Sequence, residues 1–256
     1  MMKRLFRLSF LLSALFAVAA MQPPSQPVTL PPEQAAKEGR ALVDEMLSQQ
    51  PQENISTGVI EIRTKTNYTE IPIKFQTLVT PTNWVSIYST SGADRDHYVY
   101  LKILHTDGQP NHYLVANVNR AHWDTNEFHE LNSTALFSPF VDHSDFWIAD
   151  LGLEFLHWPD QKLLQKEMKR SRSCLVLEST NPNPRTGYAK VKCWVDNESH
   201  GILFAQAFDA KGNKTKEFTP GDFSKSKLTG QWQLGKMEIR NSQTDFTTTV
   251  RFDVDK

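Results

Sequence analysis

The chain has 256 residues, and its 28 Lys and Arg residues against 29 Asp and Glu residues give a formal net charge of −1. Hydrophobic residues make up 39% of the chain and charged residues 22%, a globular composition that excludes an intrinsically disordered protein, while only 11 Gly and 14 Pro exclude a collagen-like one. The length accommodates one large all-β domain or two small domains, and the near-neutral charge without a basic block argues against nucleic acid as the main partner.

Residues 1–20 have the pattern of a secretory signal peptide. Three basic residues lie within 3–7, and the apolar run after them ends in small residues at 18–20. Because this run has about thirteen residues and a membrane-spanning helix needs ~20, we expect cleavage near Ala20 and no transmembrane segment in the mature chain. Cleavage removes three basic residues and leaves 25 basic against 29 acidic residues, a net charge of −4. The sequence therefore predicts an exported, mildly acidic protein.

A Pro-rich leader at 21–32, which we expect to be extended, precedes the first regular element. Apolar residues then recur with helical spacing between 33 and 50, and Pro51 stops the pattern. These apolar residues are Ala35, Ala36, Gly39, Leu42, Val43, Met46 and Leu47. The amphipathic helix opens one domain that we expect to span 33–256, because no linker-like stretch divides the rest of the chain.

Alternating apolar residues predict β-strands over most of the remaining chain. A first group of strands is expected near 60–62, 71–79, 84–88, 99–103 and 114–118. A second group is expected near 173–179, 188–195, 202–209, 214–219, 231–240 and 244–254. A strongly twisted antiparallel sheet, with helices packed into its concave side, accommodates this order around a single core.

Between the two strand groups, residues 144–158 predict a helix that is apolar nearly all round. Ser144 or Asp145 can cap it, and Pro159 ends it. Its large side chains are Phe146, Trp147, Leu151, Phe155 and Trp158. Two interpretations stay open: the helix belongs to an ordinary core, or it lines a hydrophobic groove. Two Trp and two Phe within thirteen residues exceed what packing against one sheet face requires, which weakens the core interpretation, and only the resemblance described below favours the groove.

A basic amphipathic stretch comes next, at 162–172. It is either the solvated face of an ordinary helix or a docking surface for anionic lipid headgroups or an acidic partner. We favour the solvated face, because such charges with interleaved apolar residues are common on helices.

The two cysteines, Cys174 and Cys193, flank a predicted strand, turn and strand. In an exported protein such a pair favours a disulfide. If the hairpin pairs position 174 with position 193, Val176 faces Val191. The eighteen intervening residues are unlike the Cys-x-x-Cys spacing of a catalytic dithiol. We therefore expect one disulfide across a long-looped hairpin.

No motif for catalysis, cofactor binding or metal binding emerges. The chain lacks the Gly-x-Ser-x-Gly, Gly-x-x-x-x-Gly-Lys-Ser/Thr and Gly-x-Gly-x-x-Gly patterns. Its eight histidines are scattered, and His129-Glu130 lacks the second histidine of a zinc helix. We expect no enzyme activity, no catalytic residue, no metal and no cofactor.

The block from Pro139 to Pro159, PFVDHSDFWIADLGLEFLHWP, resembles the central motif of the LolA/LolB-like outer-membrane lipoprotein-sorting proteins, in a largely uncharacterised bacterial subgroup. Further similar stretches lie at 172–179, 187–191, 194–196, 208–212, 216–218 and 244–252, so that the resemblance covers roughly residues 35–256. It implies an incomplete antiparallel β-barrel with helices covering its concave face and a hydrophobic cavity for acyl chains. It also implies a periplasmic protein that moves lipoproteins or lipids between membranes by differential affinity.

The resemblance further implies partners and site residues. The cargo would be lipoprotein acyl chains or phospholipid, passed from an inner-membrane donor to an outer-membrane acceptor protein. The implied cavity would be lined by the sheet residues Phe75, Val79, Trp84 and Tyr88 and by the helix residues Phe146, Trp147, Leu151, Phe155 and Trp158. Arg63 would correspond to a strand arginine that bonds to lid-helix carbonyls in the well-known carrier, although the alternation places it opposite Ile60 and Ile62.

Two other functions compete with the carrier. An envelope-sensing or protein-interaction module on the same fold would use the basic stretch for its contact. A hydrolase would need a carboxylate or histidine essential for turnover, and the sequence nominates none.

Overall fold

The computed structural model describes residues 30–91, 97–119, 127–184, 187–227, 230 and 232–254. The predicted signal peptide and all but the last three residues of the Pro-rich leader lie outside the described residues.

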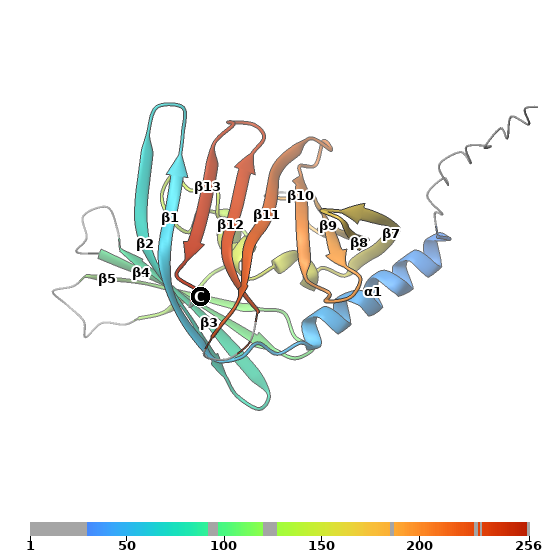
Figure 1. Ribbon diagram of the computed structural model, residues 1–256, viewed down its shortest axis with the longest axis horizontal. Helices are drawn as coiled ribbons and strands as arrows, with labels where there is room; N and C mark the ends of the chain where they lie inside the picture. Colours follow the sequence, from blue (N-terminus) through green and yellow to red (C-terminus); the bar gives the residue numbers. More distant parts are fainter. Residues whose placement is uncertain are drawn as a thin grey trace, which may run out of the picture.

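Within these ranges, one long helix and a 13-stranded antiparallel sheet make up the fold (Figure 1). The helix α1 is Pro32–Ser48, close to the predicted 33–50. The strands are β1 Asn54–Arg63, β2 Tyr68–Val79, β3 Asn83–Ser91, β4 His97–Thr106, β5 His112–Asn119, β6 His129–Glu130, β7 Asp160–Lys169, β8 Arg172–Thr180, β9 Lys190–Asp196, β10 Ile202–Phe208, β11 Lys214–Lys225, β12 Trp232–Asn241 and β13 Thr247–Phe252. Short helical pieces lie between β6 and β7: η1 Ala135–Phe137, α2 Ile148–Leu151 and η2 Glu154–His157.

The sheet is open, with the strand order β6-β5-β4-β3-β2-β1-β13-β12-β11-β10-β9-β8-β7. The pairing of β1 with β13 joins the first strand group to the second, so that one continuous sheet replaces two separate domains. The sheet curves around the segment between β6 and β7, and the predicted incomplete barrel with helical pieces in its concave side is confirmed (Figure 1).

Two clusters of buried apolar side chains form the core. The first joins the inner face of β1, β2, β4, β12 and β13 to the segment between β6 and β7. Its sheet members include Ile60, Ile62, Ile73, Leu101, Ile103, Ile239 and Val250, and its members from the segment are Leu136, Phe140, Phe146, Ile148 and Ala149. The second cluster joins α1, η2 and the inner face of β7 to β10. The concave side of the sheet is therefore filled by the chain's own central residues.

Helix α1 packs directly on the edge strand β7. A Cβ atom at Gly39 would come within 2.7 Å of the Lys162 Cα, so the helix approaches the strand backbone at a point where only glycine fits. Leu42 and Val43 are buried beside it, as the predicted apolar stripe requires. The helix thus covers part of the edge that β7 would otherwise expose.

The continuous helix predicted for 144–158 is wrong. Trp147 is extended and pairs with Pro139 in an isolated bridge, and α2 then lasts four residues. Leu153, in the left-handed region at φ 49°, separates α2 from η2. Carbonyls of this turn are bonded by side chains from the sheet, Asn111 to Gly152 and Tyr88 to Leu151, at 2.9 and 3.3 Å. These tertiary hydrogen bonds replace those of a helix, and local spacing does not reveal them.

The helix considered for the basic stretch at 162–172 is also wrong, because these residues form β7 and the turn into β8. Arg170 and Ser171 both have positive φ, at 51° and 62°, as a two-residue hairpin turn requires. The Lys169 ammonium lies 3.8 Å from the centre of the Phe204 ring, and Arg170 donates to the Pro220 carbonyl. Two of the cations considered for partner docking therefore already have contacts within the chain.

The predicted disulfide does not form in the structure, where both thiols are free and buried. The register of β8 and β9 pairs Cys174 with Asp196 and Leu177 with Cys193, three positions away from the pairing we expected. An odd shift sends the two side chains to opposite faces of the sheet. Cys174 packs beside Trp194 in a small outer cluster, whereas Cys193 lies in the second core cluster.

We expect neither cysteine to react with a thiol reagent in the folded protein at pH 8, and both to react in denaturant without reductant. Burial raises the pKa of Cys193 to about 12 and also raises that of Cys174, so both thiols stay protonated as well as covered. Titration with an aromatic disulfide reagent measures both states. Fewer than two reactive thiols in denaturant would show that an oxidised pair exists.

Candidate functional site

Residues 139–158, here called the central segment, cross the concave face of the sheet and carry the candidate site (Figure 1). The segment contains α2 and η2, but buried polar contacts to distant strands hold it in place as well as apolar packing. Both kinds of contact therefore determine its conformation.

Lys216 of β11 is the most unusual contact of the central segment. Its side chain is 2% exposed, and the ammonium donates to the Asp145 carbonyl at 2.6 Å. The same ammonium lies 3.5 Å from an oxygen of Asp150 and 3.5 Å from the centre of the Trp147 ring. Burial lowers the pKa of Lys216 to about 8, and the Asp150 carboxylate opposes that shift. One buried cation thus binds three groups of the segment.

Two further sheet contacts hold the same part of the segment. The Tyr188 hydroxyl donates to Asp150 at 2.8 Å, and its ring stacks on Trp147 with 4.7 Å between centres. Asn241 donates to the Asp145 carboxylate at 2.7 Å. Burial raises the pKa of Asp150, while the Lys216 charge acts in the opposite direction. The chain from 145 to 150 is therefore fixed by strands β11 and β12 and by the residues before β9.

The later half of the segment is bonded to other elements. The Tyr113 hydroxyl donates to Glu154 at 2.8 Å, and burial raises the pKa of that carboxyl. Arg40 of α1 donates to the Trp158 and Pro159 carbonyls at 2.8 and 2.7 Å. Helix α1 and strand β5 thus hold the end of the segment.

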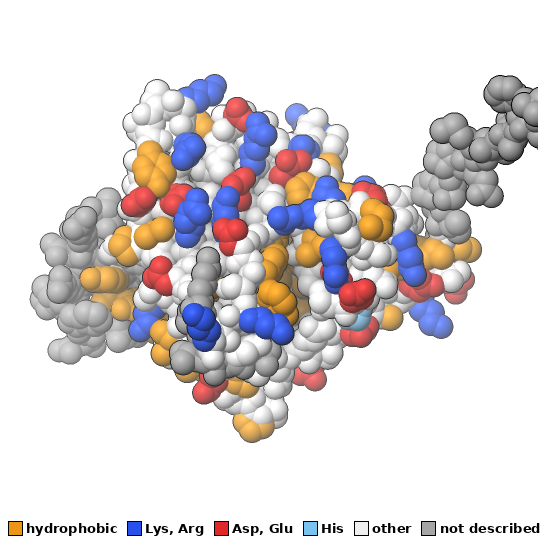
Figure 2. All heavy atoms as spheres, in the orientation of Figure 1, with side chains coloured by type: hydrophobic (Ala, Val, Ile, Leu, Met, Phe, Trp, Pro, Cys, Tyr) orange, Lys and Arg blue, Asp and Glu red, His pale blue; other side chains and the backbone are white. Residues whose placement is uncertain are grey.

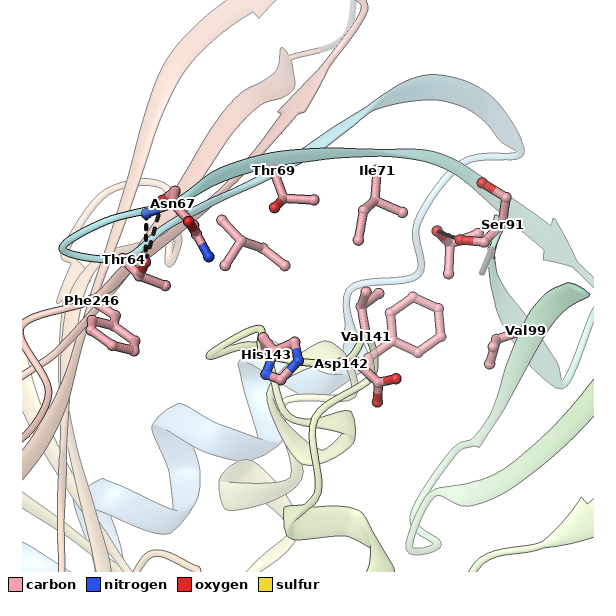
Figure 3. A pocket seen from close by; sticks show the side chains of 13 residues that line it. Thr64, Asn67, Thr69, Ile71, Ser91, Val99, Val141, Asp142, His143 and Phe246 are labelled. Carbon is pink, nitrogen blue, oxygen red and sulfur yellow. Dashed lines mark hydrogen bonds between the residues drawn. The ribbon is translucent and has the colours of Figure 1, made fainter. Parts of the chain in front are cut away.

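A cavity of about 520 Å³ remains between the start of the central segment and the inner face of β1 to β4 (Figure 3). It lies at the end of the half-barrel where the β1–β2 and β12–β13 turns meet. Its lining residues are Ile62, Thr64, Asn67, Thr69, Ile71, Thr90, Ser91, Val99, Phe140, Val141, Asp142, His143 and Phe246. In Figure 3, Thr69 and Ile71 project from β2 toward the loop that carries Asp142 and His143. Apolar walls with a few polar groups are typical of small-molecule sites.

The sequence-predicted cavity residues lie elsewhere, and none of the nine lines this cavity. Phe75 stacks on Tyr88 with 4.8 Å between ring centres, and Trp84 stacks on His105 at the same distance. Val79 pairs with Trp84 across β2 and β3. Their assignment to a ligand site stays a prediction.

The five predicted residues of the central segment pack against the core. Phe146 and Trp158 are buried, in the first and second cluster respectively. Leu151 packs on the first cluster, and Trp147 and Phe155 pack on the second. The structure thus brings all five to the concave side, where they fill space.

Arg63 does not contact the central segment among the described residues. It is exposed at the end of β1, with its guanidinium 5.7 Å from the centre of the Tyr68 ring. Bonds from cations to carbonyls of the segment instead come from Lys216 and Arg40. The alternation of inner and outer residues along β11 could have placed Lys216 on the concave side, because Lys216 lies on the same inner face as Phe218.

On the face shown in Figure 2, acidic and basic side chains alternate over the strands, as on an ordinary solvated surface. Within the described ranges, no three His, Cys, Asp or Glu side chains are placed to hold a metal ion. No helix in those ranges is long and apolar enough to cross a membrane.

The comparisons with known proteins agree with this architecture. A family model described as "uncharacterized protein" matches residues 123–254. A Vibrio parahaemolyticus domain, whose name assigns it to outer membrane lipoprotein sorting, superposes with a TM-score of 0.68 at 17% identity, covering 85% of this chain and 91% of that one. A DUF1329 family protein from Desulfovibrio piger superposes with a TM-score of 0.68 at 18% identity, covering 86% of this chain and 91% of that one. A LolA superfamily protein from Nitrosomonas europaea superposes with a TM-score of 0.56 at 15% identity, covering 86% of this chain and 91% of that one. No curated protein matches. These similarities establish a LolA-like fold.

Proposed function

The chain belongs to the uncharacterized-protein family whose model spans residues 123–254, and from its LolA-like half-barrel we propose that it is a periplasmic, non-enzymatic carrier of acylated cargo. The observation that carries this proposal is the cavity of about 520 Å³ between the sheet and the central segment. Its volume lies within the range of ~300–1,000 Å³ that small-molecule sites occupy.

The chemistry of the cavity supports an acyl ligand. Ile62, Ile71, Val99, Phe140 and Phe246 supply apolar surface from both the sheet and its covering loop. Transfer of each methylene group from water to such a surface contributes about 0.8 kcal/mol. A long chain therefore binds without any covalent step, and its release requires only an acceptor of higher affinity.

The predicted signal peptide supports export to the periplasm, where such cargo would pass from an inner-membrane donor to an outer-membrane acceptor. A direct test is lipid mass spectrometry of the mature chain, purified from its native periplasm without denaturant. Stoichiometric phospholipid or acylated peptide is the expected result. An empty protein that also takes up no acyl probe would exclude the carrier.

Replacement of Ile71 by Trp is expected to weaken binding of an uncharged fluorescent acyl probe at least tenfold. The larger ring fills space that the chain would occupy, and overpacking costs about 1–3 kcal/mol of stability. Fluorescence titration of the probe and urea denaturation measure the two effects. Ile55→Trp is the matched control, because Ile55 is 61% exposed on β1 and lines no part of the cavity. Equal affinities of the two variants would place the ligand elsewhere.

A further inference from the structure

We propose that this cavity selects a single acyl chain carrying an uncharged, hydrogen-bonding head group, as in a monoacylglycerol or a neutral acyl amide. The inference rests on the proposed carrier function and narrows its cargo. It follows from the volume of the cavity, from the charge of its lining and from the polar groups at its rim.

The volume suits one chain. Sites for one small-molecule ligand have volumes of about 300–1,000 Å³, and this cavity lies within that range. The cavity has about 520 Å³, and the rest of the concave side is occupied by the central segment. A second chain would therefore have to displace residues that Lys216 and Tyr188 bond in place.

The lining disfavours an anionic head group. No Lys or Arg is among the thirteen lining residues, and Asp142 is their one carboxylate. Lys65 belongs to the β1–β2 turn but does not line the cavity, and Arg240 is paired with Asp245 at 2.6 Å. A phosphate or carboxylate head would thus lie beside the exposed Asp142 carboxylate, with no Lys or Arg in the lining to offset the repulsion.

Neutral donors and acceptors are available instead. The side chains of Asn67, Thr69 and Ser91 make no hydrogen bond within the described part of the chain. Thr90 already donates to the Pro72 carbonyl at 2.7 Å, which leaves its oxygen free to accept. Hydroxyl or amide groups of a head group satisfy such partners without the desolvation of a charge.

Competition against the uncharged acyl probe at pH 8 tests the inference. The competitors are monopalmitoylglycerol, lysophosphatidylglycerol with the same chain, dipalmitoylphosphatidylglycerol and a triacylated lipopeptide, each below its aggregation threshold. We expect monopalmitoylglycerol to bind at least tenfold more tightly than each of the others, with one molecule per protein. Tighter binding of the lipopeptide or of either anionic lipid would overturn the inference and leave the carrier intact. Displacement by none of the four, with no probe uptake, would instead remove the proposed function.

A charge-reversal variant separates the head-group effect from the chain effect. Asp142→Lys is expected to raise the affinity for lysophosphatidylglycerol about tenfold and to leave that for monopalmitoylglycerol within about twofold. Asp44→Lys, at an exposed position on α1, is the matched control and should change neither affinity. If both variants change the affinities for lysophosphatidylglycerol and monopalmitoylglycerol alike, the lining does not discriminate between head groups and the inference fails.

Discussion

Replacement of Lys216 by Met is expected to lower the free energy of unfolding by about 3–5 kcal/mol, since removal of one partner of a buried ion pair leaves the other uncompensated. The side chains of Lys216 and Asp150 are 2% and 6% exposed, so water cannot take over the lost contact. Met has a similar volume, so the substitution leaves little empty space in the core. Urea denaturation followed by circular dichroism measures the loss.

A double-mutant cycle assigns the effect to the pair. Lys216→Met combined with Asp150→Asn removes both charges, and we expect it to recover part of the loss because no carboxylate stays buried alone. Lys214→Met is the control, since Lys214 pairs with Glu217 at a half-exposed site and such pairs contribute about 0–1 kcal/mol. A loss at Lys216 no larger than that at Lys214 would show that the cation does not anchor the central segment.

Replacement of Trp147 by Ala is expected to cost a similar amount, about 3–5 kcal/mol, while affinity for the acyl probe changes little. The indole contacts both the Lys216 ammonium, 3.5 Å from its ring centre, and the Tyr188 ring, at 4.7 Å between centres, and it meets Phe137 in an edge arrangement at 5.9 Å between centres. It does not line the cavity. Truncation therefore removes packing and a cation–π contact from the core.

The same variant tests the sequence-based hypothesis that Trp147 lines a ligand groove. Trp232→Ala is the control, because this tryptophan is 67% exposed and its removal should change stability by less than about 0.5 kcal/mol. Stability and probe affinity are measured on each variant. A tenfold loss of affinity with unchanged stability at Trp147 would assign it to the ligand site.

Strand prediction succeeded where one face of the sheet is buried and the other is not. Ile60 and Ile62 are buried while Arg63 is exposed, as the alternation in β1 predicts. In β11, Lys216 obeys the same alternation, yet a lysine on an inner face has no explanation until its partners are known. Periodicity predicts which face of the sheet a residue occupies, but it does not predict which groups the residue contacts there.

The cysteine pair shows where local pattern fails. The sequence predicts the two strands and the turn between them, but the register depends on which face of each strand meets the core. A shift of three positions is enough to separate the thiols. Register is decided by packing across the sheet and not by the spacing of two residues.

The amino-acid sequence by itself determined the class of this protein: a twisted antiparallel sheet, one amphipathic helix before it and an apolar segment between two groups of strands. Only the tertiary structure decided that the segment folds as short turns instead of a helix, that β7 is an edge strand, and that the cavity lies beside Asp142 and Ile71. The reason is physical. Strand periodicity is a local consequence of burial on one face, whereas a turn bonded by Lys216, or a cavity lined by residues as far apart in the chain as Ile62 and Phe246, depends on partners from distant elements.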